Sequence, residues 1–281
     1  MAKILIGKPC ADRIKADAAA DIETLKRRGI RPALNLLRVG ERPDDVHYEA
    51  SIIRQAGRLG IQVNAMVLPD NAGPEAVRET LVDFSADDSV HGIMLFRPLH
   101  ASYDEVSLLE AISPAKDVDG ATRRSMGRIY AGQGGFAPCT PAAVVELLKF
   151  YDVTLEGAEV VVVGRSTLVG RPSAMMLLSE NATITLTHSR TRDLAAVTRR
   201  ADIVVAALGK AEFLNADYFS TGQTVIDVGF HEVGGVICGD VAFDQVEPLV
   251  SAISPASGGV GAITTAILLK QVVSAAKVLS Q

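Results

Sequence analysis

The chain of 281 residues has no tryptophan, and aromatic residues make up only 5% of it. Cysteine is also scarce. Cys10, Cys139 and Cys238 form an odd, scattered set with no CxxC pair and no histidine at metal-ligand spacing. This spacing argues against a disulfide framework and against zinc, and we predict no metal site. A reducing cytoplasm is the compartment that this cysteine usage predicts.

The chain also lacks a dominant charge and a long apolar run. Its net charge is −5, so no general affinity for nucleic acid or for an anionic membrane is expected. No uninterrupted apolar run reaches the roughly 18 residues that a membrane helix needs. The first nine residues lack a signal-peptide pattern, because their apolar core is very short. We therefore expect a soluble globular protein whose partner is a small molecule.

Short β-rich runs alternate with helical patterns through almost the whole chain. This alternation predicts an α/β fold, with parallel sheets flanked by helices. The predicted strands cover residues 33–38, 62–68, 92–96, 159–163, 183–187, 203–206 and 224–228. The predicted helices cover residues 11–28, 45–59, 74–84, 103–111, 141–151, 171–179, 192–200 and 261–280.

One segment, residues 120–141, is crowded with glycine and proline and lacks helical or strand periodicity. We interpret it as the passage between two α/β halves. The last helix is so apolar that it must be buried, and we expect it to return to the first half. The predicted domains are residues 1–138 with 262–281, and residues 139–261.

The most informative stretch is Gly164-Arg165-Ser166-Thr167-Leu168-Val169-Gly170-Arg171-Pro172, which lies between an apolar run rich in β-branched residues and a second apolar run. This order predicts a strand, a glycine-bounded turn and a helix. Backbone N–H groups at such a helix start face an anion, and glycine lets a phosphate approach. The alternative is a tight turn that binds no ligand.

The second strand of this half ends at Thr187-His188-Ser189-Arg190-Thr191-Arg192. In dinucleotide folds this strand end meets the adenosine ribose, and an acidic residue there favours NAD. Hydroxyl and guanidinium donors stand here instead, which suits the 2′-phosphate of NADP. A solvated helix start is the alternative for Arg190 and Arg192. Glycine turns at Gly209 and Gly229 also follow predicted parallel strands, where ligands of open α/β sheets bind.

The chain resembles the methylenetetrahydrofolate dehydrogenase/cyclohydrolases, the bifunctional folate enzymes of one-carbon metabolism. The motifs that carry the resemblance are the Gly164–Pro172 stretch, Pro138-Cys139-Thr140-Pro141, His188-Ser189-Arg190-Thr191, Lys116-Asp117-Val118-Asp119-Gly120 and Gly258-Gly259-Val260-Gly261. The resemblance covers nearly the whole chain. It implies an N-terminal α/β domain, a Rossmann-like NAD(P)-binding domain, folate in the cleft between them, and a homodimer.

The resemblance also implies site residues. The cofactor-binding residues that we expect are Thr140, Gly164, Arg165, Ser166, Gly170, Ser189, Arg190, Gly209 and Phe230. In this family a tyrosine packs on the folate and an aspartate holds the pterin ring. Tyr48 and Asp119 stand at those positions and are our predicted catalytic residues. The alternative for Asp119 is a helix-capping or loop aspartate.

The chain departs from the family at the folate site. The family's helix reads Tyr-x-x-x-Lys, whereas here Ile52 follows Tyr48 at that spacing. The family's Val-Gln-Leu-Pro-Leu-Pro is Leu95-Phe96-Arg97-Pro98-Leu99-His100 here, so Phe96 replaces the glutamine that bonds the lysine. Losing one partner of a buried polar pair costs about 1–3 kcal/mol, whereas replacing both by apolar groups can be nearly neutral. We interpret Ile52 and Phe96 as one coherent exchange.

Other positions of the substrate cleft are Pro98, Leu99 and Gly259, and the family's proline after Gly261 is Ala262. His47, His91 and His100 could titrate near neutrality, but none has an identifiable partner in the sequence. We interpret each of the three histidines as a surface or core residue.

These observations predict NADP-dependent oxidation of 5,10-methylenetetrahydrofolate to 5,10-methenyltetrahydrofolate. Cyclohydrolase activity is expected to be weak or absent, because hydrolysis needs an activated water that Ile52 and Phe96 cannot supply. One alternative is an oxidoreductase that acts on another cyclic imine or iminium. A second is a non-catalytic paralogue that binds NADP.

Overall fold

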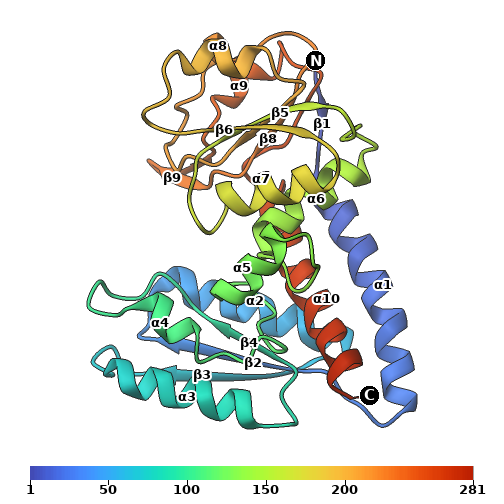
Figure 1. The fold of residues 1–281 in the computed structure, drawn as a ribbon, viewed down its shortest axis with the longest axis vertical. Helices are drawn as coiled ribbons and strands as arrows, with labels where there is room; N and C mark the ends of the chain where they lie inside the picture. The colour runs from blue at the N-terminus through green and yellow to red at the C-terminus, as the bar shows by residue number, and fades with distance from the viewer. Residues whose placement is uncertain (281) are drawn as a thin grey trace. The chain divides into compact units, whose positions relative to one another are not determined.

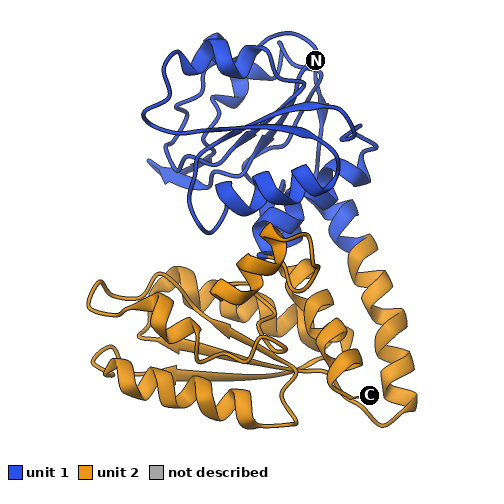
Figure 2. Ribbon diagram, viewed as in Figure 1, with its two compact units in different colours: residues 1–12, 138–264 blue, residues 13–137, 265–281 orange. Residues whose placement is uncertain are grey.

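A computed structural model describes residues 1–280 and divides the chain into two compact units (Figure 2). Unit 1 comprises residues 1–12 and 138–264, and unit 2 comprises residues 13–137 and the chain from residue 265 onward. Each unit contains its own parallel sheet. The two units are described separately below.

Unit 1 is built on a six-stranded, wholly parallel sheet in the order β1-β11-β8-β7-β5-β6 (Figure 1). The strands are β1 (Lys3–Ile4), β5 (Glu159–Val163), β6 (Thr183–Thr187), β7 (Ile203–Ala206), β8 (Thr224–Asp227) and β11 (Ala252–Ile253). β-Branched residues dominate β5 and β7, which are buried as central parallel strands require. The other elements are α6 (Cys139–Phe150), α7 (Gly170–Ser179), α8 (Leu194–Arg199), the 3₁₀ turn Ala216–Tyr218, the hairpin of β9 (His231–Val233) and β10 (Val236–Cys238), and α9 (Phe243–Val246).

Unit 2 has a three-stranded parallel sheet in the order β3-β2-β4. Its elements are α1 (Gly7–Arg27), which begins in unit 1, β2 (Ala33–Val39), α2 (Pro43–Leu59), β3 (Gln62–Leu68), α3 (Pro74–Ala86), β4 (Gly92–Leu95), α4 (Glu105–Leu109), α5 (Arg123–Tyr130) and α10 (Gly261–Leu279), which also begins in unit 1. Apolar side chains of α3 and α4 pack on one sheet face around Leu37, Ile93 and Leu95. On the other face Gly92 lies directly against Val118 and Val272.

Both sheets change strand order at a central strand, and this position determines where ligands bind. In unit 1, β6 and β7 lie on opposite sides of β5. In unit 2, β3 and β4 lie on opposite sides of β2. Ligands of open α/β sheets bind beyond the carboxyl ends of the strands at such a switch point. The predicted cofactor turn follows β5, and Arg97 and Pro98 follow β4.

The predicted fold class is confirmed, and each of the seven predicted strands is present within a residue or two of its expected ends. The segment 120–141 is not free of regular structure, however. α5 occupies part of it, starting at Thr122, whose side chain accepts a hydrogen bond from the backbone N–H of Ser125. The sequence prediction missed a short helical pattern there, with apolar residues at Met126, Ile129 and Tyr130 after the Thr122 cap.

The division of the chain differs from the sequence expectation at the N-terminus. Residues 1–12 belong to unit 1, with the nucleotide turn, and not to the half that contains Tyr48. The reason is β1, which pairs in parallel with β11, with Lys3 opposite Ala252 and Ile4 opposite Ile253. A strand of two residues is too short to show a periodic pattern in the sequence. It is held in place by its pairing with a strand that is distant along the chain.

The expectation about long apolar segments needs a correction. α10 is long and apolar enough to cross a membrane by length and composition, with a mean hydropathy of 1.5. It escaped the search for uninterrupted runs because Thr264, Thr265, Lys270 and Gln271 interrupt it. Within the fold, 56% of this segment is buried, and Lys277 near its end pairs with Asp21 of α1 at 2.8 Å. These contacts are those of a core helix.

Candidate functional site

The turn after β5 depends on two glycines that no other residue could replace without movement. Gly164 has a φ of +123°, and a Cβ there would lie 2.0 Å from the carbonyl oxygen of Ala207. A Cβ on Gly170 would lie 2.1 Å from the carbonyl oxygen of Gly164. The turn is therefore packed against the start of its own helix and against the end of β7.

Ser166 holds the start of α7 in place. Its Oγ accepts hydrogen bonds from the backbone N–H groups of Val169, at 3.1 Å, and Gly170, at 3.3 Å. The N–H of Arg171 donates to the carbonyl oxygen of Ser166 at 3.0 Å. These N–H groups are consequently used within the turn and do not face a ligand.

Four other N–H groups, those of residues 165–168, have no hydrogen-bond partner in the part of the chain that the structure describes. All four residues are exposed. A run of unpaired N–H groups before a helix start is an anion-binding cradle. These N–H groups lie in the turn that the sequence predicted for the phosphate, just before the helix, and the phosphate site itself stays a prediction.

Three guanidinium groups lie at the same edge of the sheet. Gly164 donates its N–H to the carbonyl oxygen of Thr187 at 3.1 Å, so Arg165 begins beside the end of β6. Ser189, Arg190 and Arg192 follow β6, and all are exposed. Within residues 1–280, the side chains of the three arginines make no hydrogen bond or ion pair. They are free to meet an anion of high charge density, as the sequence predicted for a 2′-phosphate.

The Gly209 turn is organised by a residue that the sequence analysis missed. Asp240 accepts from the backbone N–H groups of Leu208, Gly209 and Lys210 at 2.7, 3.0 and 2.8 Å. Its Oδ1 also lies 2.8 Å from Nε2 of His231, on β9. The acceptor stands about 30 positions beyond its donors, and no local spacing could have identified it.

A second buried carboxylate supports this loop from behind. Asp227 accepts from the N–H groups of Gly229 at 2.9 Å and of Asp240 and Val241 at 3.0 Å each. Burial raises the pKa of Asp227 to about 6, and the three N–H donors oppose that rise. The segment Asp227–Phe230 is thereby fixed, and Phe230 at its end is 65% exposed.

Two remaining predicted residues of unit 1 have different surroundings. Thr140 lies half-buried near the start of α6. Gly259 is buried, and its carbonyl oxygen would lie 2.0 Å from a Cβ on Gly7, the first residue of α1. Gly259 is therefore a close-packing glycine of unit 1, and its assignment to the substrate cleft stays a prediction.

In unit 2, α2 presents Tyr48 toward Phe96, which follows β4. The two rings meet edge to face, with centroids 6.0 Å apart and planes inclined at 75°. Phe96 is 3% exposed, and Ile52, one helical turn beyond Tyr48, is completely buried. Ile52, where the resemblance led us to expect a lysine, is thus part of the apolar core of unit 2.

The two aspartates of Lys116-Asp117-Val118-Asp119-Gly120 have separate tasks. Asp117 is completely buried and accepts from the N–H groups of Ala121 and Thr122, at 2.9 Å each, and from the hydroxyl of Ser125. Asp117 thus supports the loop, and the choice between a substrate role and a loop role for Asp119 stays open. Asp119 instead forms an ion pair with Arg97, in which Nη2 lies 3.1 Å from Oδ2.

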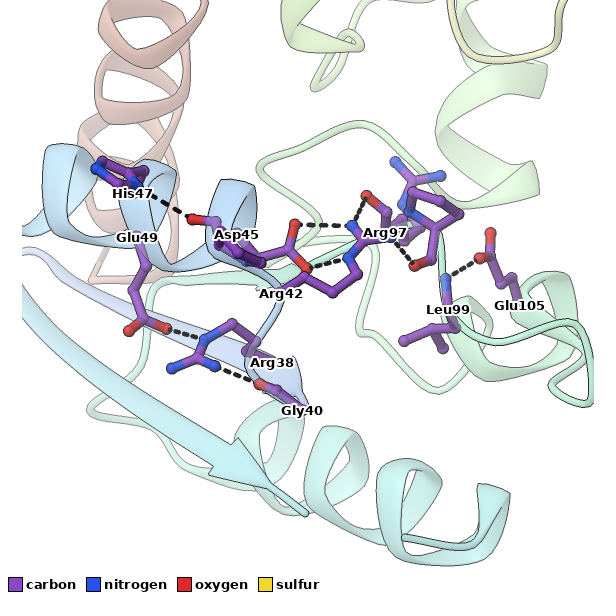
Figure 3. A network of polar contacts seen from close by, with 11 residues as sticks. Arg38, Gly40, Arg42, Asp45, His47, Glu49, Arg97, Leu99 and Glu105 are labelled. Atoms are coloured by element: carbon purple, nitrogen blue, oxygen red, sulfur yellow. Dashed lines mark hydrogen bonds and ion pairs between the residues drawn. The ribbon is translucent and has the colours of Figure 1, made fainter. Parts of the chain in front are cut away.

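Arg42 fixes the backbone on which Arg97 stands, as Figure 3 shows. It forms a two-pronged pair with Asp45, with both N–O distances 2.8 Å. It also donates to the carbonyl oxygens of Pro98 at 3.0 Å and Arg97 at 3.3 Å. Nearby, Arg38 pairs with Glu49 at 3.2 Å, and the side chains are 6% and 12% exposed. Each cation of this network has a carboxylate of its own.

A cavity of about 240 Å³ opens at this carboxyl edge of the sheet. Its walls are formed by Val39, Arg42, Asp45, Asp70, Phe96, Pro98, Leu99, His100 and Tyr103. A larger cavity of about 600 Å³ lies at the opposite edge, between the starts of β2 and β3 and the residues before β4. The smaller cavity lies at the carboxyl edge, where open sheets bind ligands, and its walls include the predicted cleft residues Phe96, Pro98 and Leu99.

Of the three histidines considered in the sequence, His47 and His91 are surface or core residues, whereas His100 is exposed and forms part of the wall of the smaller cavity. Exposed His47 and His100 contact the carbonyl oxygen of Pro43 and the hydroxyl of Ser102 through Nδ1. His91 is buried and accepts from the N–H of Ala33. Burial, and then the charge of Lys116, lower the pKa of His91. None of the three lies in the cofactor turn or beside Asp119.

The geometry defines a class of protein: a two-unit α/β enzyme scaffold with a dinucleotide-type anion cradle in one unit and a ligand edge in the other. Residues 138–280 match the tetrahydrofolate dehydrogenase/cyclohydrolase NAD(P)-binding domain, and residues 5–119 match the catalytic domain of the same enzymes. The chain belongs to the tetrahydrofolate dehydrogenase/cyclohydrolase family.

Relatives of known structure or function match this chain over its full length. The chain is 44% identical to the bifunctional protein FolD of Carboxydothermus hydrogenoformans, covering 100% of this chain and 99% of the relative. It is 37% identical to the bifunctional FolD of Campylobacter jejuni, with a TM-score of 0.96 and 99% of each chain covered. A Trypanosoma brucei FolD, solved with NADP cofactor and an inhibitor, is 32% identical, with a TM-score of 0.94 over 100% of this chain and 99% of that one.

Proposed function

We propose that the protein oxidises 5,10-methylenetetrahydrofolate to 5,10-methenyltetrahydrofolate with NADP⁺, and that its cyclohydrolase activity is weak or absent. The family match supports the dehydrogenase class. The observation that carries the choice of cofactor is the set of unpaired N–H groups at residues 165–168 beside three unpaired guanidinium groups. Such an edge suits a ligand with a pyrophosphate and an additional phosphate on its ribose.

The exposed N–H and guanidinium groups of unit 1 have the chemistry that NADP requires. The N–H groups of residues 165–168 would hold the pyrophosphate, and Arg165, Ser189 and Arg190 would hold the 2′-phosphate. The Gly209 and Phe230 segments are held in place by Asp240 and Asp227, so that they can bind the nicotinamide end without an ordering cost. When bound, the nicotinamide ring accepts the hydride that leaves the methylene carbon.

The residues of unit 2 would bind and orient the folate. Tyr48 offers an aromatic surface held at its edge by Phe96. Asp119 offers a carboxylate for the ring nitrogens of the pterin. Loss of hydride from the methylene bridge leaves an iminium stabilised by the adjacent nitrogen, so little acid–base help is needed. Orientation and exclusion of water are therefore the tasks of these side chains.

Hydrolysis of the methenyl product requires a different kind of catalytic group. It needs a group that activates water within hydrogen-bond reach of the one-carbon unit. Ile52 and Phe96 have no titratable atom, and both are buried. The two apolar side chains support weak or absent cyclohydrolase activity, although relatives of this chain carry the name bifunctional.

The direct test follows NADPH formation from methylenetetrahydrofolate and NADP⁺, with NAD⁺ in a parallel reaction. We expect NADPH formation, a clear preference for NADP⁺, and slow or undetectable conversion of methenyltetrahydrofolate to 10-formyltetrahydrofolate. An Arg190→Glu variant should lose the preference for NADP⁺ over NAD⁺. The same measurement on Arg192→Glu, compared with Arg190→Glu, shows how much each arginine contributes to that preference. No NADPH formation by the native chain would overturn the proposal.

A second candidate is the oxidation of another cyclic imine or iminium, which the apolar pair of Ile52 and Phe96 favours. Folate binding separates the two. A tetrahydrofolate derivative should raise the melting temperature of the NADP-bound protein only if folate is the substrate. A protein that binds NADP and turns over neither class would be the non-catalytic paralogue.

We also propose that the protein is a cytoplasmic homodimer. β3 is an outer strand of its sheet with unpaired backbone groups, and Met66 and Val67 on it are 38% and 43% exposed. Long exposed edges of this kind are usually covered. Light scattering after size-exclusion chromatography would measure the mass in solution, and a monomer at micromolar concentration would contradict the dimer.

A further inference from the structure

The ion pair of Arg97 and Asp119 is a feature of this chain that the proposed reaction does not by itself require. Nη2 of Arg97 lies 3.1 Å from Oδ2 of Asp119, and the two side chains are 15% and 18% exposed. The position of Arg97 carries a leucine in the family's Val-Gln-Leu-Pro-Leu-Pro run. A guanidinium therefore stands beside the carboxylate that is expected to meet the substrate ring.

The pair is not needed to hold the loop. Asp117 already supports residues 121–125, with each of its oxygens bonded. The backbone at Arg97 is fixed independently by Arg42, which is itself paired with Asp45. Both backbones thus have supports other than the contact between Arg97 and Asp119.

Arg97 also has donors left over. Of its guanidinium N–H groups, those on Nη2 meet Asp119, while Nε and Nη1 have no hydrogen-bond partner among residues 1–280. A mostly buried guanidinium normally uses several of its five N–H donors. A carboxylate that accepts and a guanidinium that donates thus stand side by side at the ligand edge of unit 2.

We propose that Arg97 is a positioning and specificity residue, which together with Asp119 selects a substrate ring whose N–H donors lie next to a carbonyl oxygen. The proposal rests on the proposed function and refines it. A 2-amino-4-oxo pyrimidine edge, as in a pterin, has N–H donors for Asp119 and a carbonyl for the free N–H groups of Arg97. A 2,4-diamino edge has an amino group in place of that carbonyl, so that two hydrogen-bond donors, the amino group and Arg97, would face each other.

The test compares the binding of folic acid and of its 4-amino analogue to the full-length protein with NADP present, measured by calorimetry. The native chain should bind the 4-oxo compound about 10- to 100-fold more tightly than the 4-amino analogue. In the complex with the analogue, the amino group and the guanidinium of Arg97 would both be donors, so the charged guanidinium would lack an acceptor. Arg97→Leu, which restores the family's residue, should bring this ratio close to one. Arg97→Lys should keep part of it, because the ammonium still donates but lacks the fork.

Arg78→Leu is the matched control. It removes an arginine from an exposed pair with Glu75 on α3, and it should leave the ratio unchanged. The melting temperature and the affinity for NADP of the Arg97 variants should stay close to native, since the loop is held by Asp117 and Arg42. If Arg97→Leu folds and binds NADP but keeps the native preference for the 4-oxo compound, the inference is wrong.

Steady-state kinetics of Arg97→Leu provide a second test of the same proposal. Arg97→Leu should raise the KM for methylenetetrahydrofolate about tenfold or more, with kcat and the KM for NADP⁺ changed little. A structural role would instead lower kcat and stability together. Failure of the proposed function is distinguishable, because it would show as no turnover by the native chain, whatever the binding ratio.

Discussion

At the residue scale, Ile52 allows the proposal of weak or absent cyclohydrolase activity to be tested. Its side chain is completely buried, so a lysine there would place an ammonium in the apolar core of unit 2. We expect Ile52→Lys alone to lower the free energy of unfolding by about 3 kcal/mol or more, or to lower the pKa of the new lysine. Urea unfolding measures the first effect. Ile53→Lys is the control, because Ile53 is 42% exposed and should tolerate the charge.

The double variant Ile52→Lys with Phe96→Gln tests whether only the polar pair is missing. The glutamine gives the lysine a partner, so the double variant should be more stable than Ile52→Lys and should gain some cyclohydrolase rate. A double variant that recovers stability but hydrolyses no methenyltetrahydrofolate would mean that the site has diverged beyond these two positions.

Ser173 offers a different prediction. Its hydroxyl is buried in α7 without a hydrogen-bond partner among the described residues. An unsatisfied buried hydroxyl costs about 1–3 kcal/mol, so Ser173→Ala should raise the free energy of unfolding by about 1 kcal/mol. Ser179→Ala on the same helix is the control, because that hydroxyl is exposed and bonded to Met175. A destabilised Ser173→Ala would show that the hydroxyl has a partner in solution.

At the element scale, the turn between β5 and α7 depends on a close approach of two backbones. Gly164→Ala would force a Cβ to within 2.0 Å of the carbonyl oxygen of Ala207, at a φ of +123°. We expect a loss of about 2 kcal/mol or more in unfolding free energy and a strong loss of NADP affinity. Gly222→Ala isolates the strain of a positive φ, because nothing lies within 4 Å of a Cβ there. It should cost less and leave NADP binding intact.

Elements with a repeating pattern could be predicted, and those held by distant contacts could not. β5 and β7 could be predicted because buried parallel strands are nearly continuous apolar runs. β11 and the β9–β10 hairpin are two or three residues per strand, too short for a period. The turn between β5 and α7 could be predicted from its glycines. The bonds of Asp240 to Gly209 and of Arg97 to Asp119 join residues 31 and 22 positions apart, with no spacing rule to predict them.

At the scale of the whole molecule, Asp227 makes stability depend on pH. Its pKa is raised from 3.8 to about 6 by burial, so between these values the folded chain binds more protons than the unfolded chain. The contribution of Asp227 therefore weakens the fold as pH rises from about 4 to 6. Urea unfolding across this range should show that slope, and Asp227→Asn should remove it.

The same variant shows what the charge costs at neutral pH. Three backbone N–H groups point at the carboxylate, and the amide nitrogen of asparagine cannot accept from them. Because the pKa of Asp227 is raised in spite of these three bonds, removal of the charge should outweigh their loss, and Asp227→Asn should be at least as stable as the native chain at neutral pH. A native pH slope that survives in Asp227→Asn would assign it to another group.

The pairing of β1 with β11 has a practical consequence for handling the protein. The first five residues add the outermost strand to the nucleotide-binding sheet. The backbone N–H groups of Lys3 and Leu5 donate to the carbonyl oxygens of Ser251 and Ile253, and the backbone N–H of Ala2 donates to the carboxylate of Glu247. An affinity tag, a fusion partner or a clipped N-terminus would thus disturb the cofactor half, although Tyr48 and Asp119 stand nearer in sequence. Removal of these residues would leave β11 as a bare edge, open to strands of other molecules.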